Sequence, residues 1–143
     1  LVMDRLSSEE SHDYTQWFHF SPHLPDLVKQ AGGYHTQLKS GKELRVRSAA
    51  GCALAEVLEK GVETPRLQGW ISQKYGEMVP NCALGYQQSG HKVFFATLLT
   101  LDDDDARLVW EKDEQLSLQI SANGKDESYA FSFRGSSCDV RRA

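Results

Sequence analysis

The chain has 143 residues, a formal net charge of -4, 40% hydrophobic residues and 25% charged residues. This length corresponds to a single domain, and this composition excludes a disordered chain. The longest apolar run, residues 93–101, is about half as long as a membrane-spanning helix, so no membrane span is expected.

The first predicted strand covers residues 12–20 and is rich in aromatic side chains. It ends at Ser21-Pro22 because a proline removes one backbone donor from the strand ladder. Alternation places Phe18 and Phe20 on one face and Trp17 on the other. We expect one of these faces, either Trp17 or Phe18 with Phe20, to lie in the core.

The next segments contain two clear strands and one ambiguous element. Residues 34–39 alternate weakly and residues 43–48 alternate cleanly, with a Ser-Gly turn between them. Residues 52–60 leave two alternatives, because their apolar side chains also have the i, i+3, i+4 spacing of a helix. The segment is short and has no strong N-cap, so we favour extended structure over the helix.

A loop is predicted over residues 69–80, which combine two glycines, aromatic residues and a closing proline. Trp70 and Tyr75 are candidates for stacking on a sugar ring, and Glu77 is a candidate acceptor for sugar hydroxyls. In the alternative interpretation, Trp70 fills the core and Tyr75 anchors the loop through its hydroxyl. The residue types alone favour this structural alternative.

Strands dominate the rest of the chain as well. Residues 81–88 and 91–101 are predicted to form a hairpin about Ser89-Gly90, and the apolar run within the second strand is typical of a central strand covered on both faces. A last hairpin is predicted around Asn123-Gly124, which favours a type I′ turn. The pattern predicts an all-β protein, an antiparallel β-sandwich of about eight to ten strands.

The negative charge is concentrated in one segment. Residues 101–114 hold seven acidic and two basic side chains, a net charge of -5, so the remainder of the chain sums to +1. This distribution opposes general binding of nucleic acid. The four aspartates at 102–105 are consecutive, which is not the spacing of a calcium-binding loop, so we expect a simple solvated loop there.

One strand is basic instead. Lys42, Arg45 and Arg47 are candidate contacts for an acidic ligand, because Leu44 and Val46 occupy the inward face and leave the arginines on the outward one. Arginine binds a carboxylate or sulfate through two parallel hydrogen bonds. The alternative is that these charges are solvated and do nothing specific.

Motifs for catalysis are absent from the sequence. There is no motif for a nucleophilic serine, a phosphate-binding loop, a dinucleotide-binding loop or a zinc protease, so no catalytic residue is assigned. Cys52, Cys82 and Cys138 lack the C-x-x-C spacing of a structural zinc site and are interpreted as ordinary thiols. His19 and His23 are weak candidates for metal ligands, but the sequence fixes no third ligand beside them. We therefore expect no metal or other cofactor in this chain.

Three segments resemble the C-terminal β-sandwich of heparinase II/III-like proteins: Asp4-Arg5-Leu6, residues 12–20 and residues 69–80. In that family a D-R … H-x-y-x-q-x-x-H pair of strands precedes a G-W-x-S-x-x-Y-x-E-x-x-P loop and then a strand that ends in T-L-L, as at Thr97-Leu98-Leu99. The resemblance covers residues 1 to about 101, whereas the remaining residues match only as further strands.

This resemblance implies a polysaccharide lyase that cleaves uronic-acid glycans by β-elimination. In the family, a helical toroid and an upstream part of the sandwich supply the catalytic residues and a metal site, and neither part occurs here. The resemblance therefore implies that residues 1–143 are a single sandwich domain of a longer chain. Residues 135–143 are expected to form a tail. Such a domain is inactive alone, supports the catalytic part and lines the cleft for an acidic polysaccharide.

The resemblance also implies the surroundings of the domain. Its partners would be the toroid and the upstream sandwich of the parent chain, which can hold a divalent metal, in the periplasm or cell envelope of a bacterium. Two other functions stay open: a stand-alone carbohydrate-binding module that uses Trp70, Tyr75 and the arginine pair, and a structural interaction module.

Overall fold

The computed structural model describes residues 1–49, 54–102, 106–111, 115–122, 125–134 and 137–142. All regular elements in these ranges are β-strands. In chain order they are β1 (Val2–His19), β2 (Val28–Gln30), β3 (Gly33–Gln37), β4 (Glu43–Ser48), β5 (Ala55–Lys60), β6 (Trp70–Lys74), β7 (Glu77–Pro80), β8 (Cys82–Leu101), β9 (Arg107–Glu111), β10 (Gln115–Ala122), β11 (Lys125–Arg134) and β12 (Ser137–Arg142). The predicted all-β class is confirmed.

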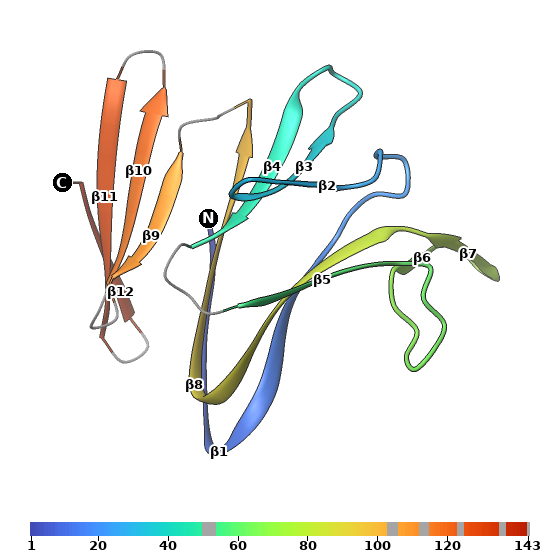
Figure 1. The fold of residues 1–143 in the computed structure, drawn as a ribbon, viewed down its shortest axis with the longest axis horizontal. Helices are drawn as coiled ribbons and strands as arrows, with labels where there is room; N and C mark the ends of the chain where they lie inside the picture. The colour runs from blue at the N-terminus through green and yellow to red at the C-terminus, as the bar shows by residue number, and fades with distance from the viewer. Residues whose placement is uncertain (50–53, 103–105, 112–114, 123–124, 135–136, 143) are drawn as a thin grey trace.

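The strands form three antiparallel sheets (Figure 1). The large sheet has the order β1-β8-β4-β3-β2, and β5 pairs with β8 outside this path. The small sheet has the order β12-β11-β10-β9, so the residues at 137–142, expected in a tail, form its edge strand. The third sheet is the β6-β7 hairpin. The turn expected at Asn123-Gly124 and most of the acidic loop at 102–105 lie outside the described residues.

The long strand β8 organises the large sheet. Its first half pairs with the end of β1 and with β5, and its second half pairs with the beginning of β1 and with β4. The prediction of a turn at Ser89-Gly90 is therefore wrong: both halves of β8 pair with β1 rather than with each other. β1 pairs with β8 from Ala83 to Thr97, and the two strands bend together, with a register shift between Ser7 and His12 (Figure 1).

Two hydrophobic cores lie on opposite faces of β8. The first is enclosed by the bent large sheet and contains Phe20, Leu27, Tyr34, Val46, Cys82, Leu84, Tyr86, Val93 and Phe95. The second lies between the large and small sheets and contains Ala49, Ala96, Leu98, Ala106, Leu108, Leu116, Leu118 and Phe131. Consecutive residues of β8 alternate between these cores, which confirms that its second half is a central strand covered on both faces.

The aromatic strand β1 uses one face for the first core. Phe20 is buried there and Phe18 packs against the same core. Of the two predicted alternatives, the face with Phe18 and Phe20 is therefore the one in the core. Trp17 lies on the other face, where its ring is 5.3 Å from the guanidinium carbon of Arg66. Residues 55–60 form strand β5, so the extended alternative for this segment is confirmed over the part that the structure describes.

The phenol of Tyr86 is fully buried in the first core, and its hydroxyl has no hydrogen-bond partner among the described residues. Burial, with the neighbouring Glu56 carboxylate and Tyr34 adding to it, raises the pKa of Tyr86 well above its ordinary value. Ionisation of Tyr86 therefore favours the unfolded chain as the pH rises above about 10, the pKa of an unfolded tyrosine, and costs nothing below it.

We expect Tyr86→Phe to leave stability at neutral pH unchanged or raised by about 1 kcal/mol, because the variant no longer buries an unpaired hydroxyl. The variant should also lose less stability than the wild type as the pH rises above about 10. Urea unfolding of both proteins over this pH range checks the prediction. Equal losses in the two proteins would contradict it, since Tyr34, whose pKa is also raised by burial, would then account for the effect.

Candidate functional site

The outward face of β4 opens onto a cleft between the large and small sheets. The cleft has a volume of about 670 Å³ and is lined by the β2-β3 turn, by β4 and by the start of β9. Arg45 and Arg47 both line it, while Val46 between them is completely buried in the first core. The outward direction predicted for the two arginines is confirmed, but their side chains are half-buried in a cleft rather than fully solvated.

Contacts on both sides hold the arginine pair in place. The Arg47 Nη1 atom donates a hydrogen bond of 2.6 Å to the backbone oxygen of Ala106, which ties β4 to the chain that leads into β9. The Arg45 Nε atom lies 2.9 Å from a carboxylate oxygen of Glu43, and the His35 Nδ1 atom lies 3.1 Å from the same oxygen. These contacts reduce the conformational freedom that each guanidinium would lose on binding a ligand.

Two further cations in this cleft, Lys29 and Arg107, could not be found by sequence reasoning. Lys29 lies on β2, where its ammonium is 2.6 Å from the carboxylate of Glu56, and this hydrogen bond raises the pKa of Lys29. Arg107 begins β9 in the small sheet. Only the pairing of β2 with β3 and the packing of the two sheets bring these residues beside β4.

The charge of the cleft is positive. Among the described residues that line it, four are basic and Glu56 is the one acidic residue. The backbone groups of the β2-β3 turn and the hydroxyl of Ser48 add neutral donors and acceptors to the wall. An open site of this kind can hold an anionic group by charge-assisted hydrogen bonds, and its size fits one or two sugar rings rather than a bare ion.

Lys42 does not belong to this cleft. It lies in the turn before β4, with its Nζ atom 3.9 Å from a carboxylate oxygen of Asp102 and its side chain 59% exposed. Asp102 also accepts a hydrogen bond of 2.7 Å from the backbone nitrogen of Glu43. The prediction that Lys42 shares one face with Arg45 and Arg47 is therefore wrong, because Lys42 precedes the strand and its offsets from the two arginines, three and five positions, are odd.

The segment that was expected to be a loop forms the β6-β7 hairpin. Trp70 pairs with Pro80 and Ile71 with Val79, while an irregularity after Ile71 hides the alternation in the sequence. The loop prediction is wrong for this reason. Figure 1 shows the hairpin at the end of the molecule away from β9, so its aromatic residues do not share a site with the arginines.

The three candidate sugar contacts in this hairpin differ in their exposure and hydrogen bonding. The Trp70 Nε1 atom donates a hydrogen bond of 3.0 Å to the backbone oxygen of Val62, and its ring is half-buried outside both hydrophobic cores, so Trp70 does not fill the core. Tyr75 is fully exposed at the turn of the hairpin. Glu77 follows the turn and is exposed as well.

The two histidine candidates contact different glutamine side chains. The His19 Nε2 atom is 3.3 Å from the Gln68 side-chain nitrogen, and the His23 Nε2 atom is 3.3 Å from that of Gln73. Across the described ranges, no three His, Cys, Asp or Glu side chains are grouped as metal ligands would be.

Comparison of the chain with family models, curated proteins and solved structures gave no match. The resemblance to heparinase II/III-like proteins stays a prediction from the motifs quoted above. In the part of the chain that the structure describes, no helix is long and apolar enough to cross a membrane.

Proposed function

We propose that this chain is a glycan-contacting β-domain of a polysaccharide lyase-like protein, and that it holds an acidic polysaccharide in the cleft beside Arg45 and Arg47. The observation that carries the proposal is the cleft itself. Two guanidinium groups from one strand line it, and Lys29 and Arg107 line it as well. Uronic acids and sulfated sugars carry one anion per ring or more. A row of cations at the spacing of a strand suits such a repeating anion.

The domain would contribute binding and support rather than chemistry. β-Elimination needs a base and an acid within about 3 Å of the reacting atoms. The described residues that line the cleft offer guanidinium groups, an ammonium and a carboxylate that is paired with that ammonium. A guanidinium is always protonated and is a poor base, so it neutralises the uronate carboxylate but does not remove the C5 proton.

Heparin oligosaccharides should bind to the wild-type chain with an affinity that falls as the salt concentration rises. The Arg45→Ala/Arg47→Ala variant should bind them at least about tenfold more weakly. One charge-assisted hydrogen bond is worth roughly 1.5–3 kcal/mol, which is enough for this loss. Calorimetric titration at low and at physiological salt measures the effect. Arg45→Lys/Arg47→Lys should lie between the two proteins, because lysine keeps the charge but not the planar fork.

Lys42→Ala is the matched control, since it removes one exposed cation near β4 but outside the cleft. Its affinity should equal that of the wild type after allowance for net charge. The urea midpoint of each variant separates lost binding from lost folding, because Arg47 also bonds to Ala106. Equal affinity of the wild type and the double variant would remove the arginine pair from the site.

The isolated chain should release no unsaturated uronate product from heparin, alginate or chondroitin. The described residues that line the cleft include cations suited to an acidic glycan, but no base and acid pair aimed at one point. Absorbance of the unsaturated product in a long incubation is the measurement. A rise that depends on the chain and disappears in Arg45→Ala/Arg47→Ala would show that the cleft itself is catalytic.

A further inference from the structure

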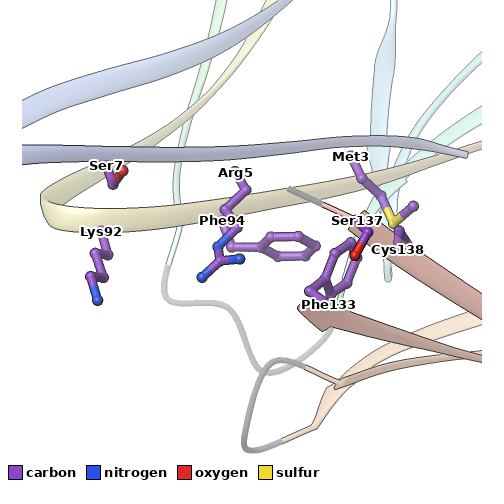
Figure 2. Close-up of a pocket in the computed structure, with 8 residues that line it drawn as sticks. All are labelled: Met3, Arg5, Ser7, Lys92, Phe94, Phe133, Ser137 and Cys138. Atoms are coloured by element: carbon purple, nitrogen blue, oxygen red, sulfur yellow. The ribbon is translucent and has the colours of Figure 1, made fainter. Parts of the chain in front are cut away.

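A second hollow lies at the other open side of the two-sheet packing. The arginine cleft lies against β4 and β9, whereas this groove lies between β1 and β12, the edge strands of the large and small sheets. It has a volume of about 700 Å³ and is lined by Met3, Arg5, Ser7, Lys92, Phe94, Phe133, Ser137 and Cys138 (Figure 2). None of these residues was assigned to a site by the sequence.

The strand register explains how these side chains meet. In the large sheet Arg5 pairs with Phe94 and Ser7 pairs with Lys92, and in the small sheet Phe133 pairs with Cys138. Directly paired side chains of an antiparallel sheet lie on one face with their Cβ atoms about 4.5–5.5 Å apart. Each wall therefore presents an aromatic ring with a polar or charged neighbour.

The floor of the groove is a cluster of aromatic rings. The ring centroids of Phe94 and Phe133 are 4.9 Å apart in an edge-to-face arrangement, so the rings of the two sheets meet at the base of the groove. Trp110 stacks on Phe94 with a centroid distance of 4.1 Å and an interplanar angle of 29°. Because Phe94 and Phe133 are only half-buried, this cluster leaves apolar ring surface open to a ligand.

The charged groups at the groove all have one sign. Among its described lining residues, Arg5 and Lys92 are basic and none is acidic. Figure 2 shows both side chains extending from the same pair of strands, with Arg5 beside the Phe94 ring. The Ser7 hydroxyl supplies a further hydrogen-bond donor, whereas the Ser137 hydroxyl donates to the backbone oxygen of Arg134 at 2.8 Å and can only accept from a ligand.

We propose that this groove is a binding site for a small aromatic anion, a planar ring that carries a carboxylate, sulfate or phosphate. The ring would lie against Phe94 and Phe133, and the anionic group would lie toward Lys92 and Arg5. Either part alone gives weak binding, because exposed cations hold any anion loosely and an open apolar floor holds any ring loosely. Their juxtaposition selects a ligand that has both parts.

Cys138 provides a local reporter of occupancy, because it lines the groove and is exposed. A Cys52→Ser background removes the thiol that lies outside the described residues, and Cys82 is buried. In this background the rate at which Cys138 reacts with neutral dithiodipyridine measures access to the groove. Naphthalene sulfonate serves as the aromatic anion, and naphthalene methanol serves as its neutral counterpart.

Naphthalene sulfonate should protect Cys138 in a saturable manner, and naphthalene methanol should protect it at concentrations about tenfold higher or more. Lys92→Ala should reduce this difference between the probes, with Arg5 left as the basic lining residue, and high salt should reduce it as well. Phe133→Ala should weaken both probes. Lys39→Ala, which removes an exposed lysine of the β3-β4 turn outside the groove, should change neither.

The results can overturn the proposal directly. Failure of naphthalene sulfonate to protect the thiol, equal protection by the two probes, or an unchanged difference in Lys92→Ala would each reject an aromatic-anion site. Lys92 is exposed, so the variant keeps the fold and this arm stays decisive. Unchanged protection in Arg45→Ala/Arg47→Ala would show that the groove is separate from the proposed glycan cleft, whereas loss of protection there would reject two independent sites.

Discussion

Replacing Phe95 with alanine should lower the free energy of unfolding by about 3–5 kcal/mol, the usual cost of removing a buried aromatic ring. Phe95 is 1% exposed and lies in the first core on the second half of β8. That half pairs with β1 on one side and with β4 on the other, and its opposite face packs on the small sheet. The surroundings are fixed on every side, so they cannot collapse into the space that the ring leaves.

Urea unfolding at neutral pH measures this loss, with Tyr75→Ala as the control. Tyr75 is fully exposed at the turn of the β6-β7 hairpin, so its truncation should change stability by no more than about 0.5 kcal/mol. The two variants remove rings of similar size from opposite environments. If their midpoints shift equally, the packing of β8 between two cores is not what stabilises the chain.

The sequence pattern predicts a strand best when buried and exposed side chains alternate regularly along it, or when both of its faces are buried. Val46 lies at the centre of a clean alternating run and is completely buried, and the apolar run of β8 on both faces matches its place between two cores. The pattern fails where backbone irregularity interrupts it. The register shift after Ile71 hides β6, and Ser89-Gly90 reads as a turn although β8 pairs with β1 on both sides of it, with a register shift between Ser7 and His12.

The candidate site was predictable only in the part that one strand supplies. Arg45 and Arg47 are two residues apart on a strand, so they share a face in any fold that keeps β4. Lys29 and Arg107 come from a different hairpin and a different sheet, and only tertiary packing places them in the same cleft. The groove at Arg5 and Lys92 was missed for the same reason, because its residues come from four strands.

The wall of the arginine cleft depends on the glycine at the start of β3. Gly33 has a φ of 152°, and a Cβ atom added there would lie 2.3 Å from the backbone oxygen of Val46 and 3.0 Å from the Cγ atom of Arg47. Backbone atoms of β4 cannot yield as a flexible side chain can, since β4 is paired on both sides. Only a residue without a Cβ atom allows β3 to approach β4 this closely.

We expect Gly33→Ala to lower the free energy of unfolding by about 3 kcal/mol, through overpacking and backbone strain that each cost about 1–3 kcal/mol. It should also weaken heparin binding, because the backbone shift that relieves the clash moves Arg47 within the cleft. Gly32→Ala is the matched control: its φ is 89°, but its Cβ atom would meet nothing within 4 Å.

The control should therefore lose only the strain of a left-handed backbone, about 1–2 kcal/mol, and should keep its affinity for heparin. Urea unfolding and calorimetric titration of the two variants, side by side, separate a close approach of β3 to β4 from the general needs of a turn. Equal losses in the two variants would mean that β3 does not press against β4 at Val46. The position of Arg47 in the cleft would then not depend on the turn, and the affinity of Gly33→Ala for heparin should equal that of the wild type.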